Sequence, residues 1–263
     1  MKKRFCKSIL VSCLVLLTAL LAIGAGSTGS VQNTDEGLPQ EAALYFERGK
    51  TCEEAKDYTA AMEWYQKAAE AGSTAAMKML GHMYYDGIGV KIDVEKAWEW
   101  YRKAADAGDA GAMAAIGWLY QYNEKDDLEA MAWYLLAAEH GYAGAMTEVG
   151  CLYKDGQGVA CDYQKAMEWF QKGADGGDYV GMYYVGLLYE EGLGVEADFQ
   201  TAMEWYVKSA EAGNRVIMNN IGYWYETGEK LPQDLEKARE WYQKAADAGL
   251  ESAQWQLKKL DNK

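Results

Sequence analysis

The stretch Ala61-Met62-Glu63-Trp64-Tyr65-Gln66-Lys67-Ala68-Ala69-Glu70-Ala71-Gly72 returns, with small changes, five more times along this chain of 263 residues. Its tryptophan marks every copy, at Trp64, Trp100, Trp133, Trp169, Trp205 and Trp241. Successive tryptophans are 36, 33, 36, 36 and 36 residues apart. A fixed period of this length is typical of a helical solenoid, in which each repeat stacks on its neighbours. The sequence therefore predicts an all-α fold built from antiparallel helix pairs.

The repeated stretch also contains the signals that begin and end a helix. An aspartate stands four residues before the leading alanine of every copy: Asp57, Asp93, Asp126, Asp162, Asp198 and Asp234. Aspartate at this place accepts a hydrogen bond from free amide groups of the first turn. A glycine suited to the left-handed conformation closes each copy: Gly72, Gly108, Gly141, Gly177, Gly213 and Gly249. We expect the second helix of each hairpin between these two markers.

The apolar positions of this helix predict its buried face. Ala61, Trp64 and Ala68 are spaced i, i+3, i+7, which places them on one stripe, with Tyr65 on a neighbouring stripe. We therefore predict a core position for all six tryptophans and for the aromatic residue after each: Tyr65, Tyr101, Tyr134, Phe170, Tyr206 and Tyr242. A row of rings that binds sugars is the alternative, but the helical period already explains the spacing.

The first helix of each hairpin is marked by a glycine 17 residues after a tryptophan: Gly81, Gly117, Gly150, Gly186 and Gly222. A glycine in a helix costs about 1 kcal/mol relative to alanine, so its recurrence indicates a partner that passes too close for a Cβ. All variation in length falls in the loop that follows, which in its full form is Asp86-Gly87-Ile88-Gly89-Val90. Because a helix precedes it, we interpret Gly-x-Gly as a turn with Val90 in the core, and not as a phosphate loop.

The order Leu-Gly-x-x-Tyr-x-x-Gly-x-Gly-Val, then Asp-x-x-x-Ala-x-x-Trp-Tyr-x-Lys-Ala-Ala-x-x-Gly, resembles the SEL-one-like repeat (SLR), a subclass of tetratricopeptide-like repeats. The resemblance implies a right-handed superhelical solenoid and a non-catalytic role as a protein–protein interaction scaffold or adaptor. It divides the chain into a tetratricopeptide-like first hairpin at 40–72, five SLR repeats at 73–249 and a C-terminal capping helix at 250–263.

The residues before the first hairpin read as an export signal. Met1–Lys7 is basic, Ser8–Ala25 is apolar, and small residues follow, which is the order of a secretory signal. We expect a signal peptide at 1–25, a disordered linker at 26–39, and a bacterial-type protein that is secreted, periplasmic or held at the cell surface. The alternative is an uncleaved segment that anchors the chain in a membrane, because about 18 apolar residues can span a bilayer.

Charge and missing motifs exclude several kinds of function. The net charge of −14 repels phosphate backbones, so nucleic acid is not expected as a partner, and a membrane is expected only through an uncleaved N-terminal segment. The chain has two histidines, no His-Glu-x-x-His and no Cys-x-x-Cys, so we expect no catalytic residue, metal or cofactor. A remnant β-lactamase-like hydrolase is disfavoured because Ser-x-x-Lys is missing. We expect a monomer.

Three cysteines lie outside the leader: Cys52, Cys151 and Cys161. Cys151 follows Gly150 in a first helix and Cys161 precedes Asp162, so the two lie across one hairpin. A disulfide between Cys151 and Cys161 and two free thiols remain as alternatives.

Solenoids bind their ligands along the concave face. The resemblance to tetratricopeptide repeats implies that first helices line this face, at places beside the marker glycine and three or four residues away. The binding candidates are Lys78, His82, Tyr85, Trp118, Tyr122, Lys154, Tyr183, Leu187, Tyr223 and Glu226, with Asp86, Thr147, Glu190 and Asn219 at related places. These residues vary between repeats, and their aromatic character is typical of a peptide-binding face. A peptide or protein ligand is expected; recognition of cell-wall glycan or peptide is the alternative.

Overall fold

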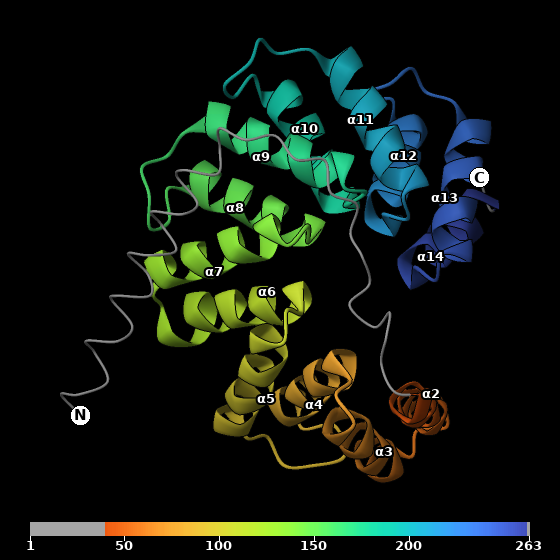
Figure 1. Cartoon of the computed structure of the whole chain (residues 1–263). Coiled ribbons are helices and arrows are strands. Elements are labelled where there is room, and N and C mark those ends of the chain that lie inside the picture. Colours follow the sequence, from red (N-terminus) through yellow and green to blue (C-terminus); the bar gives the residue numbers. More distant parts are fainter. Residues whose placement is uncertain (1–39, 262–263) are drawn as a thin grey trace. The chain divides into compact units, whose positions relative to one another are not determined.

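The computed structural model describes residues 40–261, and this part of the chain is helical without a strand (Figure 1). Its helices are α2 (Gln40–Glu54), α3 (Tyr58–Glu70), α4 (Thr74–Asp86), α5 (Val94–Asp106), α6 (Ala110–Leu119), the short π-helix η1 (Tyr120–Glu124), α7 (Asp127–Glu139), α8 (Ala143–Asp155), α9 (Tyr163–Asp175), α10 (Tyr179–Glu191), α11 (Phe199–Glu211), α12 (Arg215–Thr227), α13 (Leu235–Asp247) and α14 (Glu251–Asp261). The signal or anchor expected at 1–25 and the linker expected at 26–39 lie outside the described residues.

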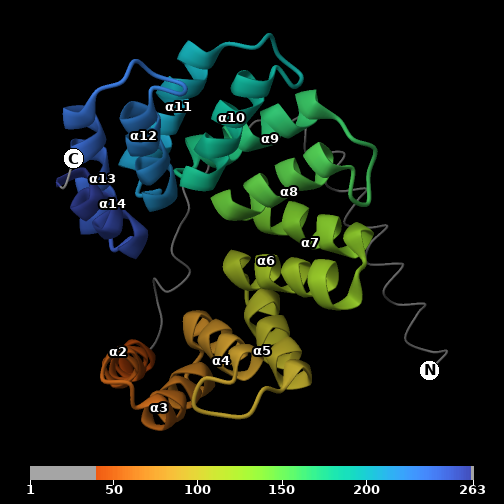
Figure 2. The ribbon, with the colours of Figure 1, turned by 180° about the vertical axis from the view of Figure 1, so that it is seen from behind.

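The described residues form two compact units. Unit 1 runs to Ala145 and includes the turn Gln157–Val159, whereas unit 2 holds Met146–Gly156 and the chain from Ala160 onward. In unit 1, α2 packs on α3, α4 on α5 and α6 on α7; in unit 2, α10 packs on α11 and α12 on α13, with α14 against α13. Figure 2 shows the same pairs from behind. The predicted all-α fold of paired helices is confirmed.

The predicted helix ends are confirmed as well. The carboxylate of Asp93 accepts a hydrogen bond from the Lys96 amide at 3.0 Å, and the other five marker aspartates cap their helices in the same way. The six closing glycines have φ between 81° and 103°, a conformation that favours glycine. Both signals act over a few neighbouring residues, which is why sequence alone could place them.

The buried stripe of the second helix differs from the prediction. Ala61, Tyr65 and Ala68 are fully buried, so the stripe is spaced i, i+4, i+7 and passes through the tyrosine, not through Trp64. All six residues that follow a tryptophan are at most 3% exposed. The six tryptophans are only half-buried. The predicted core position is therefore confirmed for the aromatic residue that follows each tryptophan, but the tryptophans themselves are not fully buried.

A cation covers each tryptophan ring of the repeat, and in five of the six copies it comes from the same helix. In five copies a lysine three residues later lies over the indole ring, with the ammonium nitrogen 3.9 to 4.2 Å from the ring centroid. In α7, where Leu136 takes the place of that lysine, Arg102 of α5 lies 5.1 Å from the Trp133 ring. The lysine stems shield the ring while their charged ends stay in water.

The marker glycines lie against the buried aromatic ring of the second helix. A Cβ on Gly81 would lie 2.5 Å from Cε1 of Tyr101, and the other four marker glycines, with Gly49 of α2, would meet their own rings at 2.5 to 2.8 Å. The predicted close approach of the two helices at the marker glycine is confirmed, and the group that lies against the glycine is the aromatic ring of the second helix. The interpretation of Gly-x-Gly as a turn is also supported, because a Cβ on Gly89 would lie 2.8 Å from Cβ of Tyr58 at the start of α3. Val90 is half-buried.

The three cysteines of the described residues are free thiols, so the possible Cys151–Cys161 disulfide is not formed here. The Cys161 thiol donates to the carbonyl oxygen of Lys154 at 3.2 Å. Burial, helped by the nearby Glu148 carboxylate, raises the pKa of the Cys151 thiol to about 12, which keeps it protonated. Within residues 40–261, every helix is too short or too polar to cross a bilayer.

Candidate functional site

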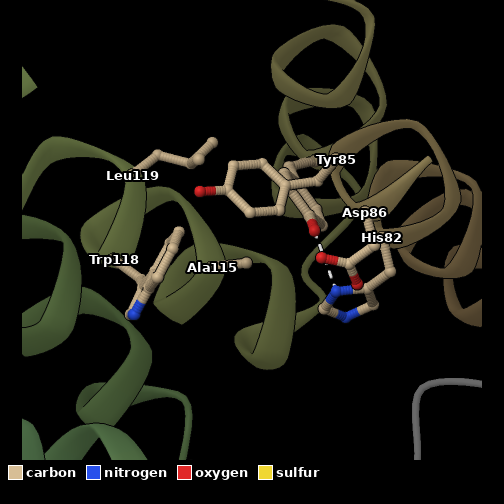
Figure 3. A pocket seen from close by; sticks show the side chains of 7 residues that line it. His82, Tyr85, Asp86, Ala115, Trp118 and Leu119 are labelled. Atoms are coloured by element: carbon tan, nitrogen blue, oxygen red, sulfur yellow. Dashed lines mark hydrogen bonds between the residues drawn. The ribbon is translucent and has the colours of Figure 1, made fainter. Parts of the chain in front are cut away.

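Three of the predicted binding residues, His82, Tyr85 and Trp118, line one pocket in unit 1 (Figure 3). Its volume is about 260 Å³. The lining residues are His82, Tyr85 and Asp86 from α4, Tyr101 from α5, and Ala115, Trp118 and Leu119 from α6. Because α4 and α6 are first helices of successive hairpins, the pocket lies where the resemblance places the ligand face.

The pocket exists because Ala115 is small. Ala115 stands two residues before the marker glycine Gly117. The same place in other hairpins holds Glu47, Met79, Glu148, Tyr184 and Asn220, all of which have longer side chains. Ala115, Tyr101 and Leu119 were missed as site residues, although a comparison of this column among the repeats would have singled out Ala115.

Three aromatic rings continue the pocket onto the surface. The Tyr85 and Trp118 rings meet edge to face, with centroids 5.2 Å apart, and Tyr122 of η1 lies 4.9 Å from Trp118. The Tyr85 hydroxyl donates to Oδ1 of Asn123 at 3.3 Å. Trp118 is 38% exposed and Tyr122 is 55% exposed, so this cluster stays open to solvent.

The position of Tyr122 follows from a shortened loop. The repeat after Gly117 lacks three residues and the Gly-x-Gly turn, and the chain instead continues α6 into η1. This π-helical segment presents Tyr122 beside Trp118 and Asn123 beside Tyr85. The repeat pattern predicts Tyr122 on the ligand face, but no motif in residues 120–124 predicts a π-helix.

His82 lies between the pocket and the core. Its Nδ1 and the Tyr101 hydroxyl form a hydrogen bond of 2.8 Å. Burial lowers the pKa of His82, Lys78 lowers it further, and the carboxylates of Asp86 and Asp109 oppose these effects. Lys78 itself forms an ion pair with Asp109 at 3.4 Å, so the ammonium predicted to bind ligand is already engaged in the structure.

We expect His82 to make the protein less stable in mild acid. The unfolded chain takes up a proton near the ordinary histidine pKa of 6.5, whereas folded His82 does so only at lower pH. The free energy of unfolding therefore falls as pH drops below about 6.5, by less than about 1.4 kcal/mol per pH unit from this one group. His82→Gln keeps a side-chain acceptor for Tyr101 and removes this contribution.

Urea denaturation of the two proteins at pH 5, 6 and 7 measures the difference. His140→Gln is the comparison variant, because it also removes one histidine, but at an exposed position that follows α7 and lies outside the pocket. If the free energy of unfolding changes equally with pH in the parent protein and in His82→Gln, the lowered pKa of folded His82 is contradicted.

The prediction that Glu226 belongs to a binding face is wrong. Glu226 is only 4% exposed, and its carboxylate accepts from the Tyr242 hydroxyl at 2.8 Å and from Lys259 at 3.3 Å. In three other hairpins, too, the residue four places after the marker glycine accepts the hydrogen bond from the buried tyrosine hydroxyl of the second helix. The matching pairs are Glu53 with Tyr65 at 2.5 Å, Gln121 with Tyr134 at 3.0 Å and Glu190 with Tyr206 at 2.8 Å.

Two hairpins depart from this pairing in an informative way. Lys154 takes the acceptor's place in the hairpin whose core ring is Phe170, which has no hydroxyl to donate. In the hairpin of α4 and α5, His82 is the hydrogen-bond partner of Tyr101, and Tyr85, at the usual acceptor place, lines the pocket.

The remaining candidates in unit 2 do not gather into the pocket described above. Lys154 forms an ion pair with Asp155, and Tyr183 packs against Tyr184 and Tyr206 at 5.4 and 5.7 Å. Leu187 is half-buried and Tyr223 is 42% exposed. Of the related places, Thr147 is buried and donates to Asp178 at 2.5 Å, and the Asn219 side-chain oxygen is buried without a hydrogen bond.

Residues 40–261 hold no group of three or more histidine, cysteine or acidic side chains placed to bind a metal ion. The pocket itself offers aromatic faces, one carboxylate and a histidine that is hydrogen-bonded to Tyr101.

The model of a family described as Sel1 repeat matches the chain six times, over residues 40–73, 74–109, 110–142, 143–178, 180–214 and 218–250. No curated protein matches the chain. Among solved structures, a Sel1 repeat protein from Oxalobacter formigenes is 35% identical, with a TM-score of 0.68, over 79% of this chain and 86% of its own.

Two further solved structures have the same fold. The protective antigen c5321 of uropathogenic Escherichia coli, which displays an SLR fold, is 30% identical with a TM-score of 0.59; the match covers 96% of this chain and 57% of that protein. The immunity protein Pa5087 from Pseudomonas aeruginosa is 24% identical with a TM-score of 0.63, over 84% of this chain and 90% of its own, and supports the fold alone.

Proposed function

Because this chain belongs to the Sel1 repeat family, we propose that it is a non-catalytic scaffold or adaptor that binds a peptide segment of a partner protein at the pocket between α4 and α6. Sel1 repeat proteins are generally scaffolds for protein–protein interaction, and their fold is typically non-enzymatic. In this role the protein acts as a monomer that contributes one binding surface.

The exposed aromatic cluster beside the pocket is the observation that carries this proposal. Trp118 is a large ring on the surface of a helix, packed between Tyr85 and Tyr122 and next to a hollow. Tryptophan and tyrosine dominate the binding energy of protein interfaces when they line such hollows, because they offer large apolar area with few rotatable bonds. The other aromatic columns of the repeat take part in packing within and between the hairpins.

Trp118→Ala is expected to weaken peptide binding by about tenfold or more, the effect of losing a central interface residue. Peptides selected from a random display library against the parent protein provide the ligands, and isothermal titration calorimetry provides their dissociation constants. The melting temperature should change little, because the ring is partly exposed and fills no core space.

Tyr223→Ala is the matched control for this experiment. Tyr223 is also exposed and also follows a marker glycine directly, but in another hairpin. We expect it to leave the selected peptides bound. Peptides that bind Trp118→Ala as well as the parent protein would contradict the proposed surface. Binding to cell-wall fragments in place of peptides would favour recognition of the cell wall.

We propose further that the protein acts outside the cytoplasm. The basic, apolar and small segments in residues 1–25 support export, although this leader lies outside the described residues. Cell fractionation with N-terminal sequencing tests the idea. A chain that starts near residue 25 indicates cleavage, an intact leader in the membrane fraction indicates an anchor, and recovery from the cytoplasm contradicts export.

A further inference from the structure

We propose that the pocket between α4 and α6 receives a basic side chain, lysine or arginine, from the partner peptide. This inference rests on the proposed function above and specifies the chemistry of the ligand at that site. Three observations support it: the pocket contains one carboxylate, Asp86; Trp118 lies opposite this carboxylate; and Lys230 occupies a comparable site in unit 2.

The pocket pairs an aromatic wall with an unneutralised carboxylate. Figure 3 shows Trp118 and Asp86 on opposite sides, with Ala115 between them. Asp86 is exposed and forms no ion pair with any described residue, while Lys78, one helix turn or more away on α4, forms an ion pair with Asp109. A cation placed here gains both the attraction of the carboxylate and that of the ring faces.

Unit 2 contains an internal example of this recognition. Between α10 and α12, which are also first helices of successive hairpins, Lys230 lies 4.7 Å from the Trp224 ring centroid and forms an ion pair with Glu190. Lys230 stands eight residues after its marker glycine, as Lys125 does in the hairpin of α6. Lys125 follows η1 and makes no ion pair or ring contact with any described residue. The pocket between Trp118 and Asp86 in unit 1 is therefore open to a cation from a partner molecule.

The size and charge of the site suit one side chain. Pockets for whole small molecules are generally about 300–1,000 Å³, whereas this one is about 260 Å³. The apolar stem of lysine or arginine can pack against Trp118 and Leu119 while the charged end reaches Asp86. The net charge of −14 also attracts a basic partner.

The test uses three small probes and the full chain. N-acetyl-lysine methylamide and N-acetyl-arginine methylamide carry the proposed side chains, and N-acetyl-norleucine methylamide carries an apolar chain without charge. Titration is followed by NMR through the Trp118 indole N–H, which is identified by its loss in Trp118→Phe. We expect dissociation constants of about 1–10 mM for the basic probes, in keeping with their size, and binding at least about fivefold weaker for norleucine.

Variants separate the charge from the shape of the site. Asp86→Asn should weaken lysine binding about fivefold or more and leave norleucine binding unchanged. It should fold normally, because a carboxylate in the last turn of a helix is not favoured by the helix dipole. Asp155→Asn, at the same place in another hairpin, is the control and should have no effect. Ala115→Met, which introduces the side chain found at Met79, should fill the pocket and abolish binding of both basic probes.

Equal binding of norleucine and lysine, or lysine binding unchanged in Asp86→Asn, would overturn the inference. Either result would leave the proposed function intact if selected peptides still depend on Trp118. Conversely, selected peptides that do not depend on Trp118 would contradict the proposed function itself. The two failures are therefore distinguished by different measurements.

Discussion

Tyr134→Ala is expected to lower the free energy of unfolding by about 3–5 kcal/mol, the usual cost of removing a large buried ring. Tyr134 is 1% exposed, lies against Gly117 of α6 and donates its hydroxyl to Gln121 at 3.0 Å. Its loss leaves a cavity between α6 and α7, and the marker glycine offers no side chain to fill it. Urea denaturation followed by circular dichroism measures the change.

Trp133→Ala is the natural comparison, because the two aromatic residues are adjacent in the chain. Trp133 is half-buried and its ring is covered by Arg102, so we expect its removal to cost only about 1–2 kcal/mol. If Trp133→Ala proves as destabilising as Tyr134→Ala, the assignment of the core to the tyrosine column is wrong.

Gly81→Ala is expected to destabilise the protein by about 1–3 kcal/mol through overpacking. This sign is opposite to the usual effect, because alanine is favoured over glycine by about 1 kcal/mol inside a helix. The new Cβ would lie 2.5 Å from Cε1 of the Tyr101 ring, which is itself buried. Urea denaturation again provides the free energy.

The control is Gly144→Ala, a helical glycine whose nearest neighbour, at 3.2 Å, is the exposed ring of Tyr142. We expect this change to be neutral or slightly stabilising. The cause is checked by repeating Gly81→Ala in a Tyr101→Ala background, where the cost should disappear because the clashing ring is gone. A cost that persists there would place the strain elsewhere.

The features that sequence predicted well are those set by neighbouring residues. Asp93 begins a helix and Gly108 ends one because each satisfies or shapes backbone groups within a single turn. The period of 36 residues follows from the length of one hairpin, and the marker glycines reveal a close approach without identifying its partner.

The features that sequence missed depend on contacts across helices. Trp100 and Tyr101 are adjacent and equally apolar in pattern, so only the direction of the partner helix decides which ring is buried. Glu226 is expected on the ligand face from its distance to the marker glycine, but its carboxylate accepts from the hydroxyl of a core tyrosine, Tyr242. The pocket depends on the absence of side-chain atoms at Ala115, which no motif records.

The pairing of a core hydroxyl with an acceptor lies within one hairpin, between its first and second helices. Glu190 on α10 serves Tyr206 on α11, and Lys154 on α8 stands in the hairpin whose ring is Phe170 on α9. The smallest segment that can be duplicated or exchanged without mismatch is therefore the whole hairpin. A chimera that replaced only α13 by the sequence of α9 would set Phe170 against Glu226 and leave that buried carboxylate without its hydroxyl donor.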